Sequence, residues 1–464
     1  MSPNPSRVGV ALLATGTLAV MATAAAVRAG TVTPHPAVQT RTVAPRQQFR
    51  WPTAGIPTPV FAGGGSASSF LWRAWGDNFG VPIDQPAPPS KPNDEIFYAG
   101  TSEGSGIRYL LDQAFDNQQT PGNNPAYTDT TNGRNFTWPY PNSQQTPAPP
   151  DFVSGGSPLS NSTLAQYASL DQTKRGAAIV TQVAATGEAL AFNLGPNSIL
   201  GSRTFQLSRK TYCGIITGNI VDWSNSAVSN DNGGPVVSAS TPIEVVYRTD
   251  SSGQSFILTE HIANVCGPTG FPYTGGVSTT FVPPSPNPPG ATYVGVSGTS
   301  SELKEIVAPK SQPGAFGYLS PSYVKPFNPS GAPAAVLANK NGAYVALSVA
   351  SVEAAITSGP YAKPPSGYPV VTNAYIPNPK GDLSYPIDGF IWVYTYTCYP
   401  NTNPDVTPMQ SFFKAVLALA QGGPTAYDTI ANNQGFAQLG TTAKGTSLRK
   451  LGKIKTINPS SNCT

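Results

Sequence analysis

The stretch that decides the fold is Val245–Phe256, which reads VVYRTDSSGQSF. An apolar strand runs into a Ser/Gly turn, and the turn runs into a helix. Backbone N–H groups at a helix start lack intrahelical partners, and the helix dipole adds positive potential there. Ser252 would add a hydroxyl, Gly253 a close backbone approach, and Arg248 a fork of two parallel donors that suits a tetrahedral oxyanion. Asp250 is placed to hold that arginine. The stretch predicts an oxyanion cradle or, more simply, an N-capped helix with Arg248 on the surface.

Two further segments, Gly63–Phe70 and Gly100–Ile107, repeat the order of strand, Gly/Ser turn and helix. Three such helix starts are less expected by chance than one, which favours the cradle. Strand and helix patterns also alternate along the rest of the chain, which predicts an α/β architecture with buried sheets. Further strands are expected at Ile96–Tyr98, Ala178–Val183, Ala189–Asn193, Ile243–Tyr247, Ala315–Leu319, Tyr344–Val349 and Ile387–Thr397, and helices at Ile107–Phe115, Phe205–Ile215, Ser252–Asn264, Val352–Thr357 and Pro408–Ala420.

The composition excludes several classes of protein. The chain has 464 residues with 46 Gly and 49 Pro, yet 39% of its residues are hydrophobic and it contains 20 Tyr and 19 Phe. Disordered chains combine low hydrophobicity with high net charge, so a folded core is expected. A net charge of +4 without a Lys/Arg cluster gives no reason to expect a nucleic-acid partner. With His35 and His261 the only histidines, we expect no histidine metal site, no cofactor and no catalytic triad.

The first 29 residues have the pattern of a cleavable signal peptide. Arg7 precedes an apolar run from Val8 to Met21, and small residues follow at Ala22–Ala26. A membrane anchor is the alternative. No cysteine lies near the cleavage zone, so we expect a periplasmic or secreted protein without a lipid anchor. Residues 30–55 are interpreted as an extended tail, and residues 116–151 as a loop insertion.

The cysteines agree with export. Cys213, Cys266, Cys398 and Cys463 show no CxxC spacing, which gives no support for a zinc or redox motif. In an oxidising compartment they would form two disulfides, most simply Cys213–Cys266 and Cys398–Cys463. Four cysteines allow three connectivities, and all three stay open at this point.

Two other segments carry a family resemblance. Thr211–Ser224, TYCGIITGNIVDWS, resembles the helix–turn segment of periplasmic phosphate-binding proteins, the solute-binding components of phosphate ABC importers. Cys213, together with Tyr247 and Arg248 before the Ser-Gly turn, makes the chain most similar to the DING branch. Pro313–Ser320, PGAFGYLS, is similar to the second-domain strand of that family. The resemblance covers roughly residues 58–464, without the 116–151 loop.

The resemblance implies a two-lobed periplasmic-binding-protein fold of type II, in which two α/β domains joined by two crossovers enclose a ligand cleft. Lobe 1 would comprise residues 56–192 and 385–464, and lobe 2 residues 193–384. The implied function is capture of inorganic phosphate or a related tetrahedral oxyanion by hydrogen bonds, without catalysis, for delivery to an ABC importer. A monomer is expected.

The resemblance also implies a ligand set. Arg248, Ser252 and Gly253 match the family's anion-binding turn, with Asp250 as the partner of the arginine. Gln254 stands where the family has Thr, and its amide could donate. Ser102 matches the serine of the second loop, while Ser66 and Ser68 lie close to the position of a family Thr at Ala67.

One departure concerns the segment SGGSPL, Ser154–Leu159. At Gly156 the family has an Asp that accepts the proton of phosphate and so distinguishes it from sulfate. Glu103 is the candidate substitute acceptor. Two alternative functions stay open: a secreted phosphatase on the same scaffold with Ser252 as nucleophile, and a surface or adhesive protein that has lost its ligand.

Overall fold

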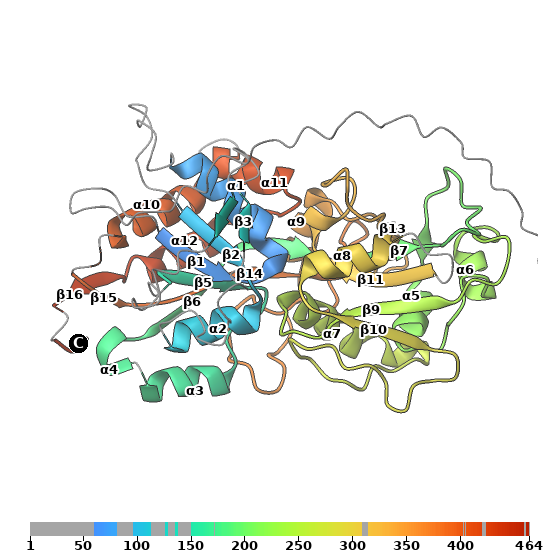
Figure 1. Cartoon of the computed structure of the whole chain (residues 1–464), viewed down its shortest axis with the longest axis horizontal. Helices are drawn as coiled ribbons and strands as arrows, with labels where there is room; N and C mark the ends of the chain where they lie inside the picture. Colours follow the sequence, from blue (N-terminus) through green and yellow to red (C-terminus); the bar gives the residue numbers. More distant parts are fainter. Residues whose placement is uncertain are drawn as a thin grey trace, which may run out of the picture. The chain divides into compact units, whose positions relative to one another are not determined.

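The computed structural model describes residues 60–80, 96–112, 126–128, 135–137, 150–170, 172–308, 314–401, 403, 405–419, 424–458 and 461–463. The predicted signal peptide, the predicted tail and most of the 116–151 insertion lie outside these residues. The described part confirms the expected α/β architecture (Figure 1). It contains no helix that is both long enough and apolar enough to span a membrane.

The first sheet has five strands in the order β2-β1-β5-β14-β6. Its first three strands are mutually parallel and β14 is antiparallel to both of its neighbours. The carboxyl ends of parallel strands share one edge, so the segments that follow β1, β2 and β5 meet there. The strands are β1 Val60–Gly64, β2 Ile96–Gly100, β5 Phe152–Gly155, β6 Ala178–Gly187 and β14 Asp388–Tyr396, and the helices after the first two strands are α1 Ser69–Phe79 and α2 Glu103–Asp112.

The second sheet has four strands in the order β10-β9-β11-β7, with β7 antiparallel to β11 and the other three parallel. Two helices begin just after its parallel strands, one after β9 and one after β10. Both N-termini therefore lie at the carboxyl edge of this sheet. The elements are β7 Ala189–Asn193, β9 Ile243–Arg248, α7 Gly253–Val265, β10 Thr292–Val296, α8 Thr299–Val307 and β11 Gly314–Leu319.

The chain passes between these two sheets at two adjacent places. Glu188 is the single residue between β6 and β7, and Ile387 immediately precedes β14. The Glu188 backbone N–H donates to the Ile387 carbonyl oxygen at 2.9 Å. The two crossings are thus hydrogen-bonded to each other.

The remaining elements surround these sheets or form small sheets of two or three strands. They are β3 Ala126–Thr128, β4 Asn135–Thr137, α3 Asn161–Leu170, α4 Gln172–Arg175, β8 Gln206–Leu207, α5 Arg209–Ile216, α6 Ser226–Asp231, β12 Val336–Ala338, β13 Tyr344–Val345, α9 Val349–Ser358, β15 Cys398–Pro400, α10 Val406–Val416, α11 Ala426–Asn433, α12 Thr441–Leu451 and β16 Lys455–Ile457, with short 3₁₀ turns at Ser66–Ser68, Gly267–Thr269 and Pro321–Tyr323.

Serine caps explain two of the predicted boundaries that are wrong. Phe205–Ile215 is not one helix: its first residues pair as β8 with β12, and α5 begins at Arg209 after Ser208 accepts a hydrogen bond from the Thr211 N–H at 3.3 Å. The strand expected at 344–349 ends at Val345, because Ser348 caps α9. A capping hydroxyl satisfies a free N–H of the first turn and so fixes the helix start.

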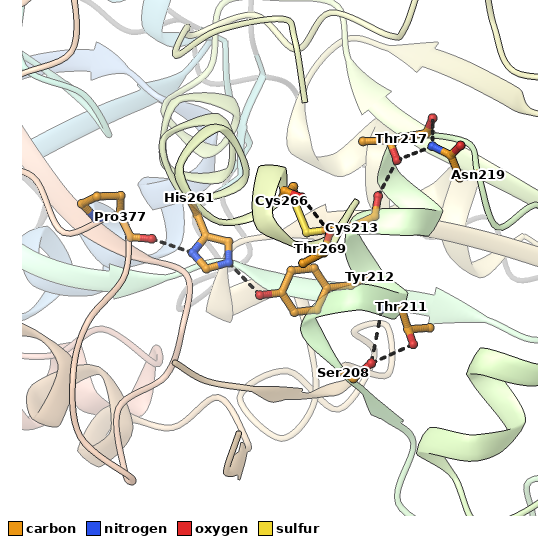
Figure 2. Close-up of a disulfide and its surroundings, with 10 residues drawn as sticks. All are labelled: Ser208, Thr211, Tyr212, Cys213, Thr217, Asn219, His261, Cys266, Thr269 and Pro377. Atoms are coloured by element: carbon orange, nitrogen blue, oxygen red, sulfur yellow. Dashed lines mark hydrogen bonds between the residues drawn. A yellow bond between two sulfur atoms is a disulfide. The ribbon is translucent and has the colours of Figure 1, made fainter. Parts of the chain in front are cut away.

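Both disulfides have the simplest of the three connectivities. Cys213 pairs with Cys266 at a Cα–Cα distance of 5.5 Å, and Cys398 pairs with Cys463 at 6.0 Å. The first disulfide joins α5 to the residue that follows α7 (Figure 2). It therefore fixes the far end of the helix whose N-terminus belongs to the candidate site.

Candidate functional site: an anion cradle at converging helix starts

Arg248 ends β9 and is buried, with 1% of its side chain exposed. Its Nε donates to Asp250 Oδ1 at 2.7 Å, and its Nη2 pairs with Asp250 Oδ2. The Gly298 N–H also donates to Asp250 Oδ1, at 3.0 Å, so the carboxylate is itself held in place. The alternative that Arg248 lies on the surface is therefore wrong, and Asp250 orients the guanidinium as a fork.

The rest of the Arg248 fork meets three neutral side chains. Nη1 donates to Gln254 Oε1 and to Thr299 Oγ1, both at 2.8 Å, and Nη2 donates to Ser66 Oγ at 3.3 Å. With the two bonds to Asp250 this makes five, as many as the N–H groups of a guanidinium. The arginine is thus fully hydrogen-bonded by groups of which three are neutral and can rearrange.

Thr299 was missed from the sequence, although the signal was present. The segment 292–301, TYVGVSGTSS, has the same order of strand, Ser/Gly turn and helix start as the three segments that were recognised. Thr299 is the first residue of α8 and is fully buried. Its N–H donates to Ser66 Oγ at 3.4 Å. A fourth helix start therefore joins the cradle.

The predicted serines divide into two groups. Ser66 reaches Arg248, whereas the Ser68 hydroxyl donates to the Gly65 carbonyl oxygen at 3.5 Å. Ser102 accepts from the Ser105 N–H at 3.0 Å and so caps α2. Ser252 accepts from the Gln254 N–H at 3.2 Å and caps α7. The structure thus brings Ser66 to the guanidinium and uses the other three hydroxyls for local backbone contacts.

Glu103 is fully buried at the first turn of α2. Its carboxylate accepts from the Gly156 N–H at 2.8 Å, the Ser157 N–H at 3.2 Å, the Tyr394 hydroxyl at 3.0 Å and the Ser157 hydroxyl. Burial raises the pKa of Glu103, and these donors act in the opposite direction. Three of these four donors reach Oε1, and Oε2 receives the Gly156 N–H.

Two glycines allow the two sheet edges to approach. A Cβ on Gly253 would lie 2.5 Å from Glu103 Oε2, and a Cβ on Gly156 would lie 2.9 Å from the Gly253 Cα. Distances below 3 Å exclude a side chain unless the backbone moves. The close approach that the structure shows at Gly253 is to Gly156 and Glu103, and its approach to an anion stays a prediction.

Gln254 connects Arg248 to a second buried carboxylate, Glu188. The Gln254 Nε2 donates to Glu188 Oε2 at 3.3 Å and to the Tyr318 carbonyl oxygen at 3.5 Å. Burial raises the pKa of Glu188 to about 8, while the bond from Gln254 and the charge of Arg248 oppose the rise. Glu188 was not predicted, because its place at the crossover is a property of the fold.

His261 makes its hydrogen bonds with residues outside this cradle. Its Nδ1 faces the Pro377 carbonyl oxygen at 2.7 Å and its Nε2 faces the Tyr212 hydroxyl at 2.9 Å (Figure 2). Burial lowers the pKa of His261 to about 3, so the ring stays neutral. Among the described residues no group of three His, Cys, Asp or Glu side chains is arranged to hold a metal ion.

The sequence of the chain is similar to those of two named proteins. The chain is 26% identical to alkaline phosphatase L of Pseudomonas aeruginosa over 62% of this chain and 70% of that protein. It is 27% identical to a phosphate-binding protein of an unknown prokaryotic organism, over 49% of this chain and 51% of that protein.

In structure the chain is similar to a high-affinity periplasmic phosphate-binding protein (PfluDING) solved with phosphate, with a TM-score of 0.57, 22% identity, and coverage of 84% of this chain and 92% of that one. This likeness confirms the two-lobed fold. A family model described as a PBP superfamily domain matches residues 53–413. Since the match covers well over half of the sequence, the chain belongs to the PBP superfamily.

Proposed function

We propose that this chain is an exported solute-binding protein that captures phosphate, or a related tetrahedral oxyanion, by hydrogen bonds and delivers it to an ABC importer. Residues 56–192 and 385–464 would form one lobe and residues 193–384 the other, with the ligand between them. The observation that carries the proposal is the buried Arg248, oriented by Asp250 where helix starts from both sheets converge.

The neutral partners of Arg248 explain how an anion could be accommodated. The hydroxyls of Ser66 and Thr299 accept from the guanidinium in this arrangement, but a hydroxyl also carries a proton. Each can turn that proton toward an anion oxygen while Arg248 does the same. Asp250 keeps the fork in one orientation throughout. The anion would thus replace acceptors that the protein supplies itself.

The surroundings of Gly156 support a broad choice of oxyanion. Glu103 is the proposed substitute for the missing acidic residue, yet four protein donors already occupy it. Three of these donors reach Oε1, and Oε2 receives the Gly156 N–H and packs against Gly253. A carboxylate held in these contacts gains less from the proton of a phosphate than a free carboxylate would. We therefore propose that the site binds phosphate and sulfate with affinities within about tenfold of each other, a difference of roughly 1.4 kcal/mol.

Calorimetric titration of the purified chain with phosphate and with sulfate tests this function. We expect saturable one-to-one binding and a higher melting temperature with ligand. The Arg248→Ala variant should lose both. A chain that melts at the same temperature with and without phosphate, sulfate and arsenate is not an oxyanion-binding protein. An Arg248→Ala variant indistinguishable from the parent would instead support the ligand-free surface role.

A phosphatase is the second candidate, because one relative is named alkaline phosphatase L. Ser252 would have to be the nucleophile, but its oxygen accepts from the Gln254 N–H. A nucleophilic serine needs an adjacent base. His261, the histidine among the described residues, has its two ring nitrogens facing the Tyr212 hydroxyl and the Pro377 carbonyl oxygen, not Ser252. Release of p-nitrophenol from p-nitrophenyl phosphate by the parent, abolished in Ser252→Ala, would establish this activity.

A further inference from the structure

The carboxamide of Gln254 links two charged groups that do not contact each other. Its oxygen accepts from Arg248 Nη1 at 2.8 Å and from the Thr299 hydroxyl at 2.6 Å. Its nitrogen donates to Glu188 Oε2 at 3.3 Å. Gln254 is fully buried, so water does not compete for these contacts. The orientation of the amide is therefore set by what faces each end.

A carboxylate and a carboxylic acid make different demands on that amide. An ionised carboxylate only accepts, which holds the amide nitrogen toward Glu188 and the amide oxygen toward Arg248. A carboxylic acid carries an O–H that can donate to the amide oxygen instead. Reversal of the amide would then turn its nitrogen toward Arg248 and Thr299 and give up the longer contact with the Tyr318 carbonyl oxygen.

We infer that Glu188 is a positioning residue that controls anion binding at Arg248 through the Gln254 carboxamide. As a carboxylate it keeps the amide oxygen on the guanidinium, where the oxygen occupies the place of an anion. As a carboxylic acid it donates its O–H to the oxygen of the reversed amide, so that Arg248, Thr299 and the Gln254 nitrogen all donate toward one point. The inference rests on the proposed function, which it deepens by coupling anion capture to a proton.

The proton balance of this step is simple. The proton bound by Glu188 comes from solvent, stays on the carboxyl group and donates to the Gln254 oxygen. No covalent bond forms or breaks. The anion adds negative charge to the cradle, and protonation of Glu188 removes one negative charge from its neighbourhood. Anion and proton therefore favour each other's binding, and by linkage each raises the affinity of the other by the same factor.

Several titratable groups surround Glu188. Gln254 of α7 and Arg248 of β9 both favour its ionised form, and Glu302 of α8 is a buried carboxyl that repels it. Tyr385, whose hydroxyl donates to the Glu188 carbonyl oxygen at 3.1 Å, lies in the fields of both Glu188 and Asp388. Burial raises the pKa of the Asp388 carboxyl and of the Glu302 carboxyl well above the usual range, which favours their neutral forms.

The sign of the pH dependence follows from the pKa of Glu188, which burial raises to about 8. Below that pH the carboxyl group is already protonated and the anion affinity is flat. Above it each binding event must take up a proton, so the affinity falls toward tenfold per pH unit. Between about pH 7 and pH 9 the fall is roughly tenfold.

The test is calorimetric titration of the full chain with phosphate, and in parallel with sulfate, from about pH 6.5 to 9.5. Glu188→Gln retains the shape of the acid but cannot titrate. The affinity ratio of parent to Glu188→Gln cancels the ionisation of the ligand. We expect this ratio to fall roughly tenfold between pH 7 and pH 9. Gln254→Thr should also lose the pH dependence, which provides a second variant if Glu188→Gln does not fold.

Glu260→Gln is the matched control, because Glu260 is a buried carboxyl of the same helix α7 and its pKa is also raised by burial. It should keep the pH profile of the parent. Titrations in two buffers of different ionisation enthalpy should show that the parent takes up about half a proton or more at pH 8.5 beyond the uptake of Glu188→Gln. If the chain binds phosphate but the affinity ratio of parent to Glu188→Gln does not change with pH, this inference is wrong and the proposed function stands. If neither the parent nor any variant binds, the proposed function is wrong as well.

Discussion

The Ser66 and Thr299 hydroxyl oxygens lie 3.0 Å apart, although the two residues belong to segments that follow strands of different sheets. Ser66 follows β1 of the five-stranded sheet, and Thr299 opens α8 after β10 of the four-stranded sheet. Both oxygens also accept from Arg248. This pair therefore reports directly on the approach of the two sheet edges and on the anion site at once.

The first prediction concerns that pair. Ser66→Ala and Thr299→Val each remove one hydroxyl that would turn toward the anion, so each should weaken phosphate binding by roughly five- to tenfold, equivalent to about 1–1.4 kcal/mol. Ser68→Ala is the matched control, because the Ser68 hydroxyl donates to the Gly65 carbonyl oxygen. Calorimetric affinities decide the matter. An effect of Ser68→Ala equal to that of Ser66→Ala would contradict the geometry.

The second prediction concerns the arginine fork. Arg248→Lys keeps the charge but loses the two parallel donors that pair with Asp250. We expect about a hundredfold weaker phosphate binding and a lower melting temperature, because truncating one member of a buried ion pair costs on the order of 2–5 kcal/mol. Arg203→Lys is the control, since the exposed Arg203 contacts only backbone carbonyls of its own neighbourhood. If Arg248→Lys bound phosphate as tightly as the parent, the arginine fork would not be part of the anion-binding site.

The parts of the site that the sequence predicts best are contiguous. Arg248, Asp250, Ser252 and Gly253 lie within one strand–turn–helix segment, whose local geometry follows from its residue types. Helix capping and the pairing of Arg248 with Asp250 need no knowledge of the rest of the chain. The same reasoning predicts the strands β7 and β11 with their observed bounds or nearly so.

The parts that were missed depend on distant segments. Thr299 and Glu188 join the cradle only because β10 and the crossover lie beside β9 and α7. The burial of Glu103 depends on Gly155, where a Cβ would lie 2.5 Å from the Glu103 Cδ. The segment 292–301 carries a local signal for the helix start at Thr299, but no local pattern indicates that this start lies beside Arg248.

The third prediction concerns the glycine contact. A methyl group at Gly253 would meet Glu103 and the backbone of Gly156. Gly253→Ala should therefore lower the free energy of unfolding by about 1–3 kcal/mol, as overpacking does, and also weaken phosphate binding. Gly267→Ala is the control, because a Cβ there meets nothing within 4 Å. Denaturant unfolding and titration measure both effects. A Gly253→Ala variant as stable and as tight-binding as Gly267→Ala would show that the two edges do not meet there.

The last prediction separates pH effects on stability from pH effects on binding. Asp151 is buried, and its carboxylate accepts from the Phe61 N–H at 2.8 Å and from the Asn403 amide at 3.0 Å. Burial and the nearby Asp405 raise the pKa of Asp151. The folded chain therefore binds a proton that the unfolded chain releases above about pH 4. The contribution of Asp151 to the free energy of unfolding should be fully present below that pH and be lost as the pH rises through the folded-state pKa of Asp151.

Asp151→Asn removes this titration, so its melting temperature should vary less between about pH 5 and pH 8 than that of the parent. Its phosphate affinity should keep the pH profile of the parent, because none of its hydrogen bonds involves Arg248, Gln254 or Glu188. Glu188→Gln should instead alter the binding profile. If Asp151→Asn shifted the pH dependence of binding as Glu188→Gln does, the effect would come from the total charge of the protein, and the specific link through Gln254 would be wrong.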